Sequence, residues 1–413
     1  MFPNIYIRIF LNFFMSINKK TIKAYALKNA VEHSGKAAAG SVVKGLFKEG
    51  LKKSGIKKII PEINQALKEV NKLSSEEQKK EFDELQKLVG KRKIRKGLPA
   101  LPGAKKGKVV MRFSPSPSGP LHIGHILTIG PNFLYVKKYG GKFYIRIEDT
   151  NPGNIYAPAY KMIEQESKWL CGNKVRIVIQ SERMPIYYNY AKKLINKNAA
   201  YVCTCEPEKF RQLILEKKPC PCRNLDVKEN LKRWKKMLDK KGYEEGEAVL
   251  RFKSDLQNKN PAMRDFPLAR INLTPHPLQK KKYRVWPLMN LAVTADDIEM
   301  KITHMIRGKE HRDNSERQKM IYKVLGKKYP WAGYIGRLHF KDLPVSASKM
   351  KQGIKEGKYK GWDDSRLPTA ISLKKQGYKP EAFWRFVEQR GLNEVDKVID
   401  KKDFFEVLDR FNK

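Results

Sequence analysis

Apolar residues recur at helical spacing in the first part of the chain. Two apolar stripes show this spacing: Ile63, Leu67 and Val70, then Phe82, Leu85 and Leu88. Positions i, i+3, i+4 and i+7 share one face of a helix, so each stripe predicts an amphipathic helix packed on other parts of the protein. Ser74 and Glu77 have the spacing of a capping box at the start of the second helix. The pattern predicts a helical N-terminal extension over residues 1–97.

From residue 109 onward, short β-rich runs alternate with helical stretches. In order they are Val109–Phe113, Ile123–Lys138, Phe143–Ile147, Tyr156–Leu170 and Val175–Ile179. Strands alternating with helices favour βαβ units and a parallel sheet, which predicts the α/β class. The ligand site of such a sheet lies beyond the carboxyl ends of its strands.

Composition changes divide the chain further. Residues 98–108 are rich in Gly, Pro and Lys and predict a linker. A stretch with cysteines, charged helices and many prolines interrupts the α/β pattern, as an insertion would. The remaining predicted segments are 109–200 and 286–362 as the two halves of the α/β domain, 201–285 as the insertion, and 363–413 as a helical end.

The charge of the chain indicates a polyanionic partner. The 413 residues include 86 Lys and Arg against 43 Asp and Glu, which gives a formal charge of +43. Hydrophobic residues make up 41%, enough for a folded core and too many for a disordered chain. A heat-adapted composition would raise Glu together with Lys, and acidic residues are scarce here. A polyanionic partner, either nucleic acid or an anionic membrane, is therefore favoured over a heat-adapted composition.

The N-terminal apolar run does not predict a membrane anchor. Met1–Met15 is interrupted by Asn4, Arg8 and Asn12, and it is too short to span a bilayer. It also lacks the basic start and the cleavage site of a signal peptide. We expect either that Met15 is the true start or that residues 1–14 form a disordered tail, and we expect a cytoplasmic protein without a membrane partner.

The densest chemical signal follows the first predicted strand. Residues 112–125 read RFSPSPSGPLHIGH, a stiff Pro/Ser/Gly turn that leads into a helix with two histidines in its first turn. A helix N-terminus offers free N–H groups and partial positive charge to a phosphate. His122 and His125 add donors for charge that moves onto phosphoryl oxygens. The alternative is a Pro-rich turn with two surface histidines, but the chain has only 7 histidines.

This segment resembles the HIGH signature of class I aminoacyl-tRNA synthetases, in the form of the glutamyl and glutaminyl enzymes and with an archaeal or eukaryotic character. The resemblance continues in collinear motifs at 146–152 (RIEDTNP), 181–183 (SER), 285–287 (VWP), 304–311 (HMIRGKEH) and 361–369 (GWDDSRLPT). It implies a Rossmann-like catalytic domain with an inserted acceptor-binding domain, preceded by a helical extension and followed by a helical connecting segment.

The resemblance implies that the amino acid is activated with ATP and then transferred to the 3′ end of tRNA. It assigns Arg112, Ser114 and Glu148 to the amino acid, with Glu148 facing its ammonium group. It assigns to ATP the residues Pro120, His122, Gly124, His125, Ser346, Ser348 and Lys349. Among these, His122, His125 and Lys349 are the implied catalytic groups. Mg²⁺ would accompany the nucleotide more than a protein cage.

A second nucleotide signature, related to KMSKS, is expected in a mobile loop. Residues 345–350 (VSASKM) are the candidate, because a Ser/Lys loop can close on the triphosphate. Ala347 stands where the second lysine of the motif is expected. Either Lys349 or a neighbouring lysine must then contact phosphate.

Arg307 distinguishes between glutamate and glutamine. A side-chain carboxylate is bound best by a fixed arginine, and Arg307 matches the position where glutamyl enzymes carry one. A salt bridge from Arg307 to Glu310 or Asp313 is the structural alternative. Relatives carry a Tyr-Asp pair after the Trp-Pro, whereas here Leu-Met-Asn follows. We therefore include Asn290 among the residues that contact glutamate.

Four of the five cysteines form two CxC pairs. Cys203 and Cys205 are separated by 14 residues from Cys220 and Cys222. Four thiolates together would make a closed structural zinc site, and the alternative is four reduced cysteines in a packed hairpin. Cys171 stands alone and is expected in the core.

The resemblance leads us to expect a glutamate–tRNA ligase that acts on tRNA(Glu), and it leaves open whether tRNA(Gln) is also charged. The archaeal relatives continue into an anticodon-binding β-barrel, so we expect either a separate barrel polypeptide or recognition through the acceptor stem alone. A glutaminyl enzyme and a tRNA-binding or tRNA-modifying paralogue without aminoacylation are the competing hypotheses.

Overall fold

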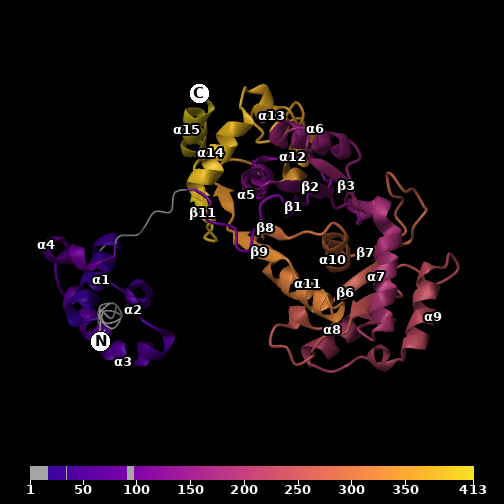
Figure 1. Ribbon diagram of the computed structural model, residues 1–413, viewed down its shortest axis with the longest axis horizontal. Helices are drawn as coiled ribbons and strands as arrows, with labels where there is room; N and C mark the ends of the chain where they lie inside the picture. Colours follow the sequence, from indigo (N-terminus) through magenta and orange to yellow (C-terminus); the bar gives the residue numbers. More distant parts are fainter. Residues whose placement is uncertain (1–16, 34, 91–96) are drawn as a thin grey trace, which may run out of the picture. The chain divides into compact units, whose positions relative to one another are not determined.

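A computed structural model gives the structure of the protein for residues 17–33, 35–90 and 97–413. The expectations about residues 1–14 lie outside these described residues. The chain divides into two compact units, residues 1–94 and 95–413, which are described separately (Figure 1). No helix in the described ranges is both long enough and apolar enough to cross a membrane.

The first unit is helical, as predicted. Its helices are α1 (Lys19–Glu32), α2 (Ala39–Leu46), α3 (Ile56–Val70) and α4 (Ser75–Leu85). Ile63 and Val70 of the first predicted stripe are buried in its core. The predicted capping box is confirmed, because Glu77 N–H donates to Ser74 Oγ while Ser74 N–H donates to the Glu77 carboxylate.

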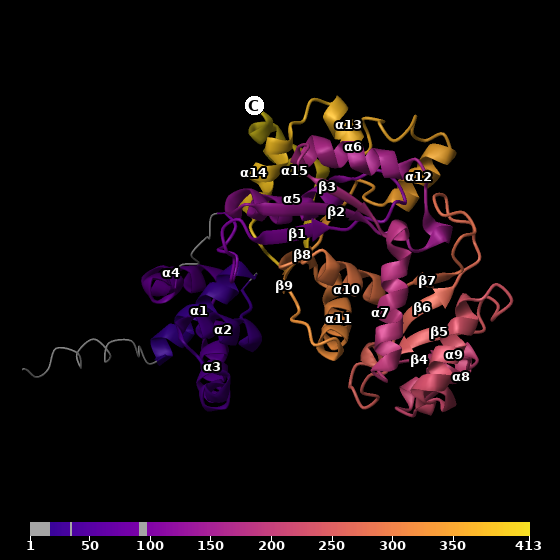
Figure 2. The ribbon, with the colours of Figure 1, turned by 45° about the vertical axis from the view of Figure 1, so that its right-hand side comes forward.

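The second unit is built on a parallel sheet, and this confirms the predicted α/β class. Its first strands are β1 (Val109–Phe113), β2 (Gly141–Ile147) and β3 (Arg176–Ile179), in that order. Helices α5 (Ile123–Tyr139) and α6 (Ala159–Cys171) connect them. Figure 2 shows the strands between α6 on one side and α10 (Met289–Glu299) on the other.

A second parallel pair, β8 (His304–Gly308) and β9 (Trp331–Ile335), continues this layer. Thr303, just before β8, donates its N–H to the Val110 carbonyl at 3.0 Å and so places β8 beside β1. The residues between the two halves form an antiparallel sheet of β4 (Ala200–Cys203), β5 (Val249–Phe252), β6 (Pro267–Ile271) and β7 (Val285–Pro287).

In its described residues the second unit contains eight further α-helices and one more pair of strands. Three belong to the middle of the chain: α7 (Met184–Asn196), α8 (Pro207–Leu215) and α9 (Val227–Leu238). The others are α11 (Arg312–Val324), α12 (Ala347–Lys355), α13 (Ala370–Lys375), α14 (Pro380–Arg390) and α15 (Lys401–Asn412). A short parallel pair, β10 (Leu338–Phe340) and β11 (Lys397–Ile399), lies near the C-terminal helices. A Cβ at Gly130 of α5 would lie 2.7 Å from Val387, so α14 packs closely on α5.

The predicted linker 98–108 is packed on the α/β unit. Leu101 is buried, and its N–H donates to the Tyr139 hydroxyl at 3.1 Å. Tyr135 Oη donates to the Pro99 carbonyl at 2.8 Å, and the ring of His304 contacts the Pro102 carbonyl at 2.9 Å. The Gly and Pro content that predicted a linker forms an ordered connection instead, because Leu101 buries apolar surface and the carbonyls are bound.

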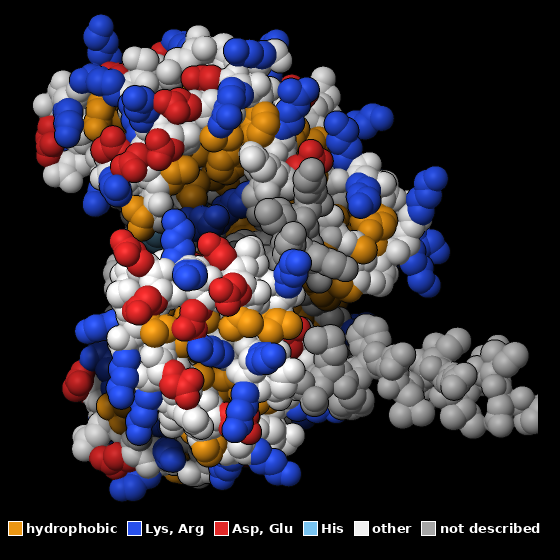
Figure 3. All heavy atoms as spheres, turned by 90° about the vertical axis from the view of Figure 1, so that its left-hand side faces the viewer, with side chains coloured by type: hydrophobic (Ala, Val, Ile, Leu, Met, Phe, Trp, Pro, Cys, Tyr) orange, Lys and Arg blue, Asp and Glu red, His pale blue; other side chains and the backbone are white. Residues whose placement is uncertain are grey.

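Lys and Arg side chains are spread over the visible surface, with acidic residues between them, and do not gather in one patch (Figure 3). On this face the basic side chains therefore form a general surface charge and not a single binding patch.

Candidate functional site

The main cavity opens beyond the carboxyl ends of β1, β2 and β8, where the parallel sheet predicts a ligand site. Its volume is about 590 Å³. The predicted site residues that line it are Arg112, Ser114, His122, Gly124, His125, Glu148, Arg307, Ser346 and Lys349. Segments more than 200 residues apart in the sequence thus meet in one cavity.

The other predicted residues lie away from this cavity. Pro120 is buried beside Leu121 and does not line it. Ser348 lines a separate cavity together with Lys351. Asn290 is buried and accepts a hydrogen bond from Gln318 at 3.3 Å, and it does not line the cavity, although its neighbour Met289 does.

One end of the cavity carries the two histidines. His122 is the N-cap of α5, and its ring stacks on His125 with centroids 3.7 Å apart. Burial lowers the pKa of His122 to about 4, and burial together with His122 lowers the pKa of His125 well below its usual value. Both Nδ1 atoms are buried and have no hydrogen-bond partner among the described residues. The rings are therefore neutral near pH 7, and both histidines line the cavity.

The segment before α5 is held by two other parts of the unit. Ile123 N–H donates to the Pro368 carbonyl at 2.9 Å, and Ala370 N–H donates to the Leu121 carbonyl at 2.8 Å. Glu166 of α6 accepts from Leu121 N–H at 2.7 Å. The motif that ends at Thr369 thus pairs with the histidine segment and fixes the start of α5.

The KMSKS-like segment is ordered at the start of a helix. Ser346 is extended, and α12 begins at Ala347. Met350 is fully buried and anchors the first turn, which explains why the predicted loop is helical here. Lys349 lines the main cavity, whereas the ammonium group of Lys351 lies 5.2 Å from the centre of the Tyr156 ring. Of these two lysines, only Lys349 faces the histidine end.

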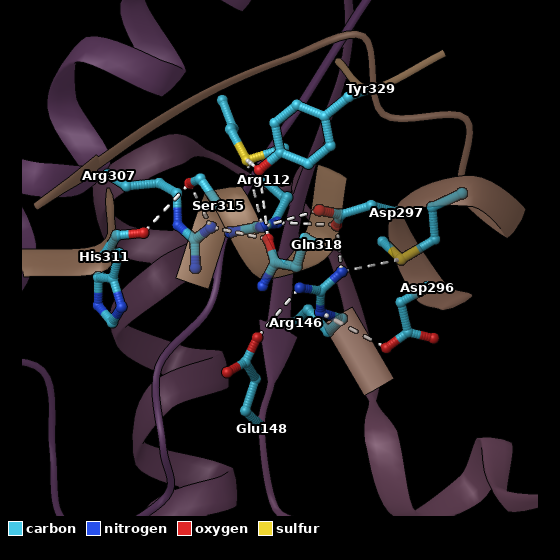
Figure 4. Close-up of polar contacts among 12 residues, drawn as sticks. Arg112, Arg146, Glu148, Asp296, Asp297, Arg307, His311, Ser315, Gln318 and Tyr329 are labelled. Carbon is cyan, nitrogen blue, oxygen red and sulfur yellow. Dashed lines mark hydrogen bonds and ion pairs between the residues drawn. The ribbon is translucent and has the colours of Figure 1, made fainter. Parts of the chain in front are cut away.

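Two other residues of the cavity wall, Arg112 and Glu148, belong to a buried ion network, drawn in Figure 4. Arg112 donates from Nε and Nη2 to the two oxygens of Asp297, both at 2.9 Å. Arg146 is fully buried and donates to Asp297 at 2.6 Å and to Glu148 at 3.0 Å. Its Nε also lies 3.6 Å from Asp296.

These carboxylates and guanidinium groups shift each other's pKa values. Burial alone would raise the pKa of Asp297, but Arg112 and Arg146 outweigh it and lower that pKa to about 2. Burial would lower the pKa of Arg146, but Asp297, Asp296 and Glu148 together raise it above its usual value. The charge of Arg146 is therefore fully balanced by carboxylates, and we call this arginine saturated. It holds Glu148 at the wall of the cavity.

Arg307 differs from Arg146 in its partners. Its Nη1 donates to Ser315 Oγ at 3.1 Å and to Gln318 Oε1 at 2.9 Å, and both acceptors are neutral. The side chain is only 6% exposed. Burial, and then the charge of Arg112, lower the pKa of Arg307. No carboxylate within the described ranges pairs with it, so the charge of Arg307 is available to an anion in the cavity.

The two carboxylates named as alternative partners of Arg307 are engaged elsewhere. Glu310 accepts from Arg337 at 2.9 Å. Asp313 accepts from the Asn260 amide at 3.4 Å. The structure therefore does not form the predicted alternative salt bridge from Arg307.

The CxC pairs come together near the start of the inserted region. Cys203 Sγ lies 3.9 Å from Cys220 Sγ, and Cys205 Sγ lies 3.7 Å from Cys222 Sγ. Four sulfurs at about 2.3 Å from a tetrahedral zinc ion would lie about 3.8 Å apart, which these two distances match. The sulfurs of Cys203, Cys205 and Cys220 all lie within 4.8 Å of one another, and Cys222 lies outside that group. The contact between the thiols of Cys203 and Cys220 lowers the pKa of Cys220 and raises that of Cys203, so Cys220 is the first of the pair to ionise. Cys171 is buried apart from them, as expected.

Sequence reasoning missed the residues that support three arginines of the site. Asp297 pairs with Arg112 and Arg146, Asp296 lies beside Arg146, and Gln318 accepts a hydrogen bond from Arg307. A signal for the acidic pair exists, because two adjacent aspartates occur in the otherwise apolar stretch Leu291–Ile298. Buried charges of this kind need partners, which points to arginines in the neighbouring strands. Gln318 offers no comparable signal.

Known proteins with similar sequences belong to the family that the sequence motifs indicate. The profile of the family described as "tRNA synthetases class I (E and Q), catalytic domain" matches residues 108–411. The chain is 44% identical over 381 residues to a glutamate–tRNA ligase of Methanocaldococcus jannaschii, which covers 92% of this chain and 68% of the relative. It is 45% identical over 394 residues to a glutamate–tRNA ligase of Pyrococcus horikoshii, covering 93% and 69%.

A solved structure shares the fold. The glutamate tRNA ligase of Elizabethkingia meningosepticum, solved in complex with its amino acid, has a TM-score of 0.53 and 23% identity. The match covers 74% of this chain and 69% of that one. With the family match over most of the second unit, the cavity geometry and the archaeal relatives in agreement, the chain belongs to the class I tRNA synthetases of the E and Q group.

Proposed function

We propose that the chain is a glutamate–tRNA ligase. The glutamate α-carboxylate attacks the α-phosphorus of ATP, pyrophosphate leaves, and glutamyl-AMP forms. The terminal adenosine hydroxyl of tRNA then attacks the glutamyl carbonyl, and AMP leaves. No protein nucleophile is needed, so the chain's own residues position the reactants and stabilise charge.

The uncompensated charge of Arg307 carries this proposal. The cavity that it faces also holds Glu148, which is a suitable partner for an ammonium group, and Ser114, whose buried Oγ has no hydrogen-bond partner among the described residues. A cation for the side-chain carboxylate and an anion for the ammonium group fit glutamate. Glutamine would leave the buried Arg307 charge unpaired, which is costly.

The histidine end supports the nucleotide. Neutral His122 and His125 can donate to phosphoryl oxygens, and a phosphate beside them would raise their pKa values and so strengthen these bonds. Lys349 is the lysine that we assign to the departing pyrophosphate, since it lines this cavity and Lys351 does not. Ser346 and Gly124 border the same space.

Mg²⁺ would enter with ATP. The structure shows no group of three metal-ligating side chains at the cavity in its described ranges, so the triphosphate would supply most ligands. The metal neutralises charge on the leaving pyrophosphate when bound.

Zinc is proposed as a structural ion held by Cys203, Cys205, Cys220 and Cys222. Three of these sulfurs lie within 4.8 Å of one another, and Cys222 Sγ also accepts from Thr204 N–H and Arg233. A closed site of this kind stabilises a fold and leaves no position for substrate. We expect purified protein to contain one zinc per chain, and Cys205→Ser to lose it. Cys171→Ser is the matched control, and zinc retained in Cys205→Ser would contradict the site.

Pyrophosphate exchange into ATP tests the main proposal. We expect exchange that depends on glutamate and exceeds exchange with glutamine, measured with and without tRNA. Transfer to tRNA(Glu) and to tRNA(Gln) transcripts then shows which tRNAs are charged. Absence of exchange with either amino acid in the presence of both tRNAs would refute the ligase and favour a tRNA-binding or tRNA-modifying function.

The reduced cysteine cluster and the translation substrates support a cytoplasmic place of action.

A further inference from the structure

Gln318 is a buried amide that connects Arg307 to two other polar side chains. Its side chain is fully buried on α11. Its Oε1 accepts from Arg307 Nη1 at 2.9 Å and from Tyr329 Oη at 3.2 Å, and its Nε2 donates to Asn290 Oδ1 at 3.3 Å. These contacts fix which end of the amide faces the guanidinium.

The amide orients Arg307 without neutralising it. An amide oxygen accepts a hydrogen bond but carries no net charge, and so does the hydroxyl of Ser315, the other acceptor of Nη1. A carboxylate in the place of this amide would form a buried ion pair with Arg307. The neighbouring network uses that second arrangement, since Arg112 and Arg146 are both paired with Asp297.

We propose that Gln318 is a specificity-determining residue, which positions Arg307 through a neutral acceptor and thereby keeps its full charge for the side-chain carboxylate of glutamate. This inference rests on the proposed ligase function. It assigns discrimination against glutamine to the pair Arg307 and Gln318 and not to Arg307 alone.

The chemistry of the two amino acids explains the selection. A glutamate carboxylate forms an ion pair with Arg307, whereas a glutamine amide leaves this buried cation without an ion-pair partner. With a glutamate residue at position 318, Arg307 would already be paired. A substrate carboxylate would then meet a second carboxylate, and a neutral amide would be tolerated better.

Gln318→Glu tests the proposal because it is nearly isosteric. Tyr329 can still donate to the retained oxygen, and the amide of Asn290 can turn to donate to the new one. We expect kcat/KM for glutamate to fall at least about tenfold, because opposed like charges in a site cost several kcal/mol. The ratio of glutamate to glutamine use should fall by a similar factor, while the KM for ATP is unchanged.

Gln318→Met is the matched control. It has a similar length and no charge, so it removes the hydrogen bond to Arg307 but leaves the guanidinium unpaired. We expect weaker glutamate use with the glutamate preference retained. Ser315→Asp is the second test, since it brings a carboxylate to the same Nη1 atom from one turn away and applies if Gln318→Glu does not fold.

The outcomes are separable. An unchanged ratio of glutamate to glutamine use in a folded Gln318→Glu or Ser315→Asp variant would overturn the role of Gln318. A wild-type chain that activates neither amino acid would instead refute the ligase function on which the inference rests.

Discussion

Arg146 and Arg307 are both buried arginines, one behind the wall of the cavity and one lining it, yet their partners differ in charge. Arg146 contacts three carboxylates, and together these raise its pKa. Among the described residues, the hydrogen-bond acceptors of Arg307 are a hydroxyl and an amide, and burial lowers its pKa. The saturated arginine belongs to the framework, and the unsaturated one is available to a ligand. Burial of a charge alone does not identify a binding residue; its partners do.

The largest expected effect is on stability at Arg146. Arg146→Met leaves Asp297, Asp296 and Glu148 without their shared cation. Removing one partner of a buried ion pair costs about 3–5 kcal/mol. Urea unfolding should show a loss of this size, and a loss below about 1 kcal/mol, the value of an exposed pair, would contradict the framework role.

Substitution of Arg307 should reduce activity with glutamate and not the stability of the fold. Arg307→Leu removes the cation for the substrate, and we expect glutamate-dependent exchange to fall at least about a hundredfold in kcat/KM, equivalent to about 3 kcal/mol. The KM for ATP should stay close to that of the wild type. Equal losses for glutamate and ATP would indicate that Arg307 only supports the fold.

The ion pairs of Asp297 with Arg112 and Arg146 should make the unfolding free energy depend on pH in the acid range. The pKa of Asp297 is lowered from 3.8 to about 2 in the folded protein. Its stabilisation is therefore present above pH 4 and lost as the pH falls towards 2, and it amounts to about 2 kcal/mol. The difference in unfolding free energy between wild type and Asp297→Asn should narrow by this amount between pH 5 and pH 2. A difference independent of pH would show that Asp297 is not ionised in the network.

The smallest effect is expected at Ser315. Ser315→Ala removes one neutral acceptor from Arg307 and leaves Gln318 in place. A single hydrogen bond contributes about 1 kcal/mol, so the KM for glutamate should rise about fivefold. An unchanged KM would mean that Gln318 alone orients the guanidinium.

The sequence predicted the local elements better than the contacts between them. Strand Val109–Phe113 was predicted at its observed bounds, and Ser74 and Glu77 form the expected cap, because both patterns depend on neighbouring residues. Arg307 and Arg112 were predicted to line one site, and the cavity contains both. The sequence did not indicate that Asp297 binds two nitrogens of Arg112.

The contacts that sequence reasoning missed cross long distances in the chain. Arg112 and Asp297 are 185 residues apart, and the Gln318 amide has no motif of its own. Segment 98–108 was predicted as a linker from its Gly and Pro content, but its packing depends on Tyr135, Tyr139 and His304. Such pairings follow from the topology of the sheet, which local composition does not specify.

The most direct test of the central claim is the unfolding free energy of Arg307→Leu, measured with and without glutamate. If Arg307 is a buried cation without an internal partner, the variant without ligand should be at least as stable as the wild type, and glutamate should stabilise only the wild type. A variant that is destabilised by about 3 kcal/mol or more without ligand, as expected for a broken buried ion pair, would contradict the account.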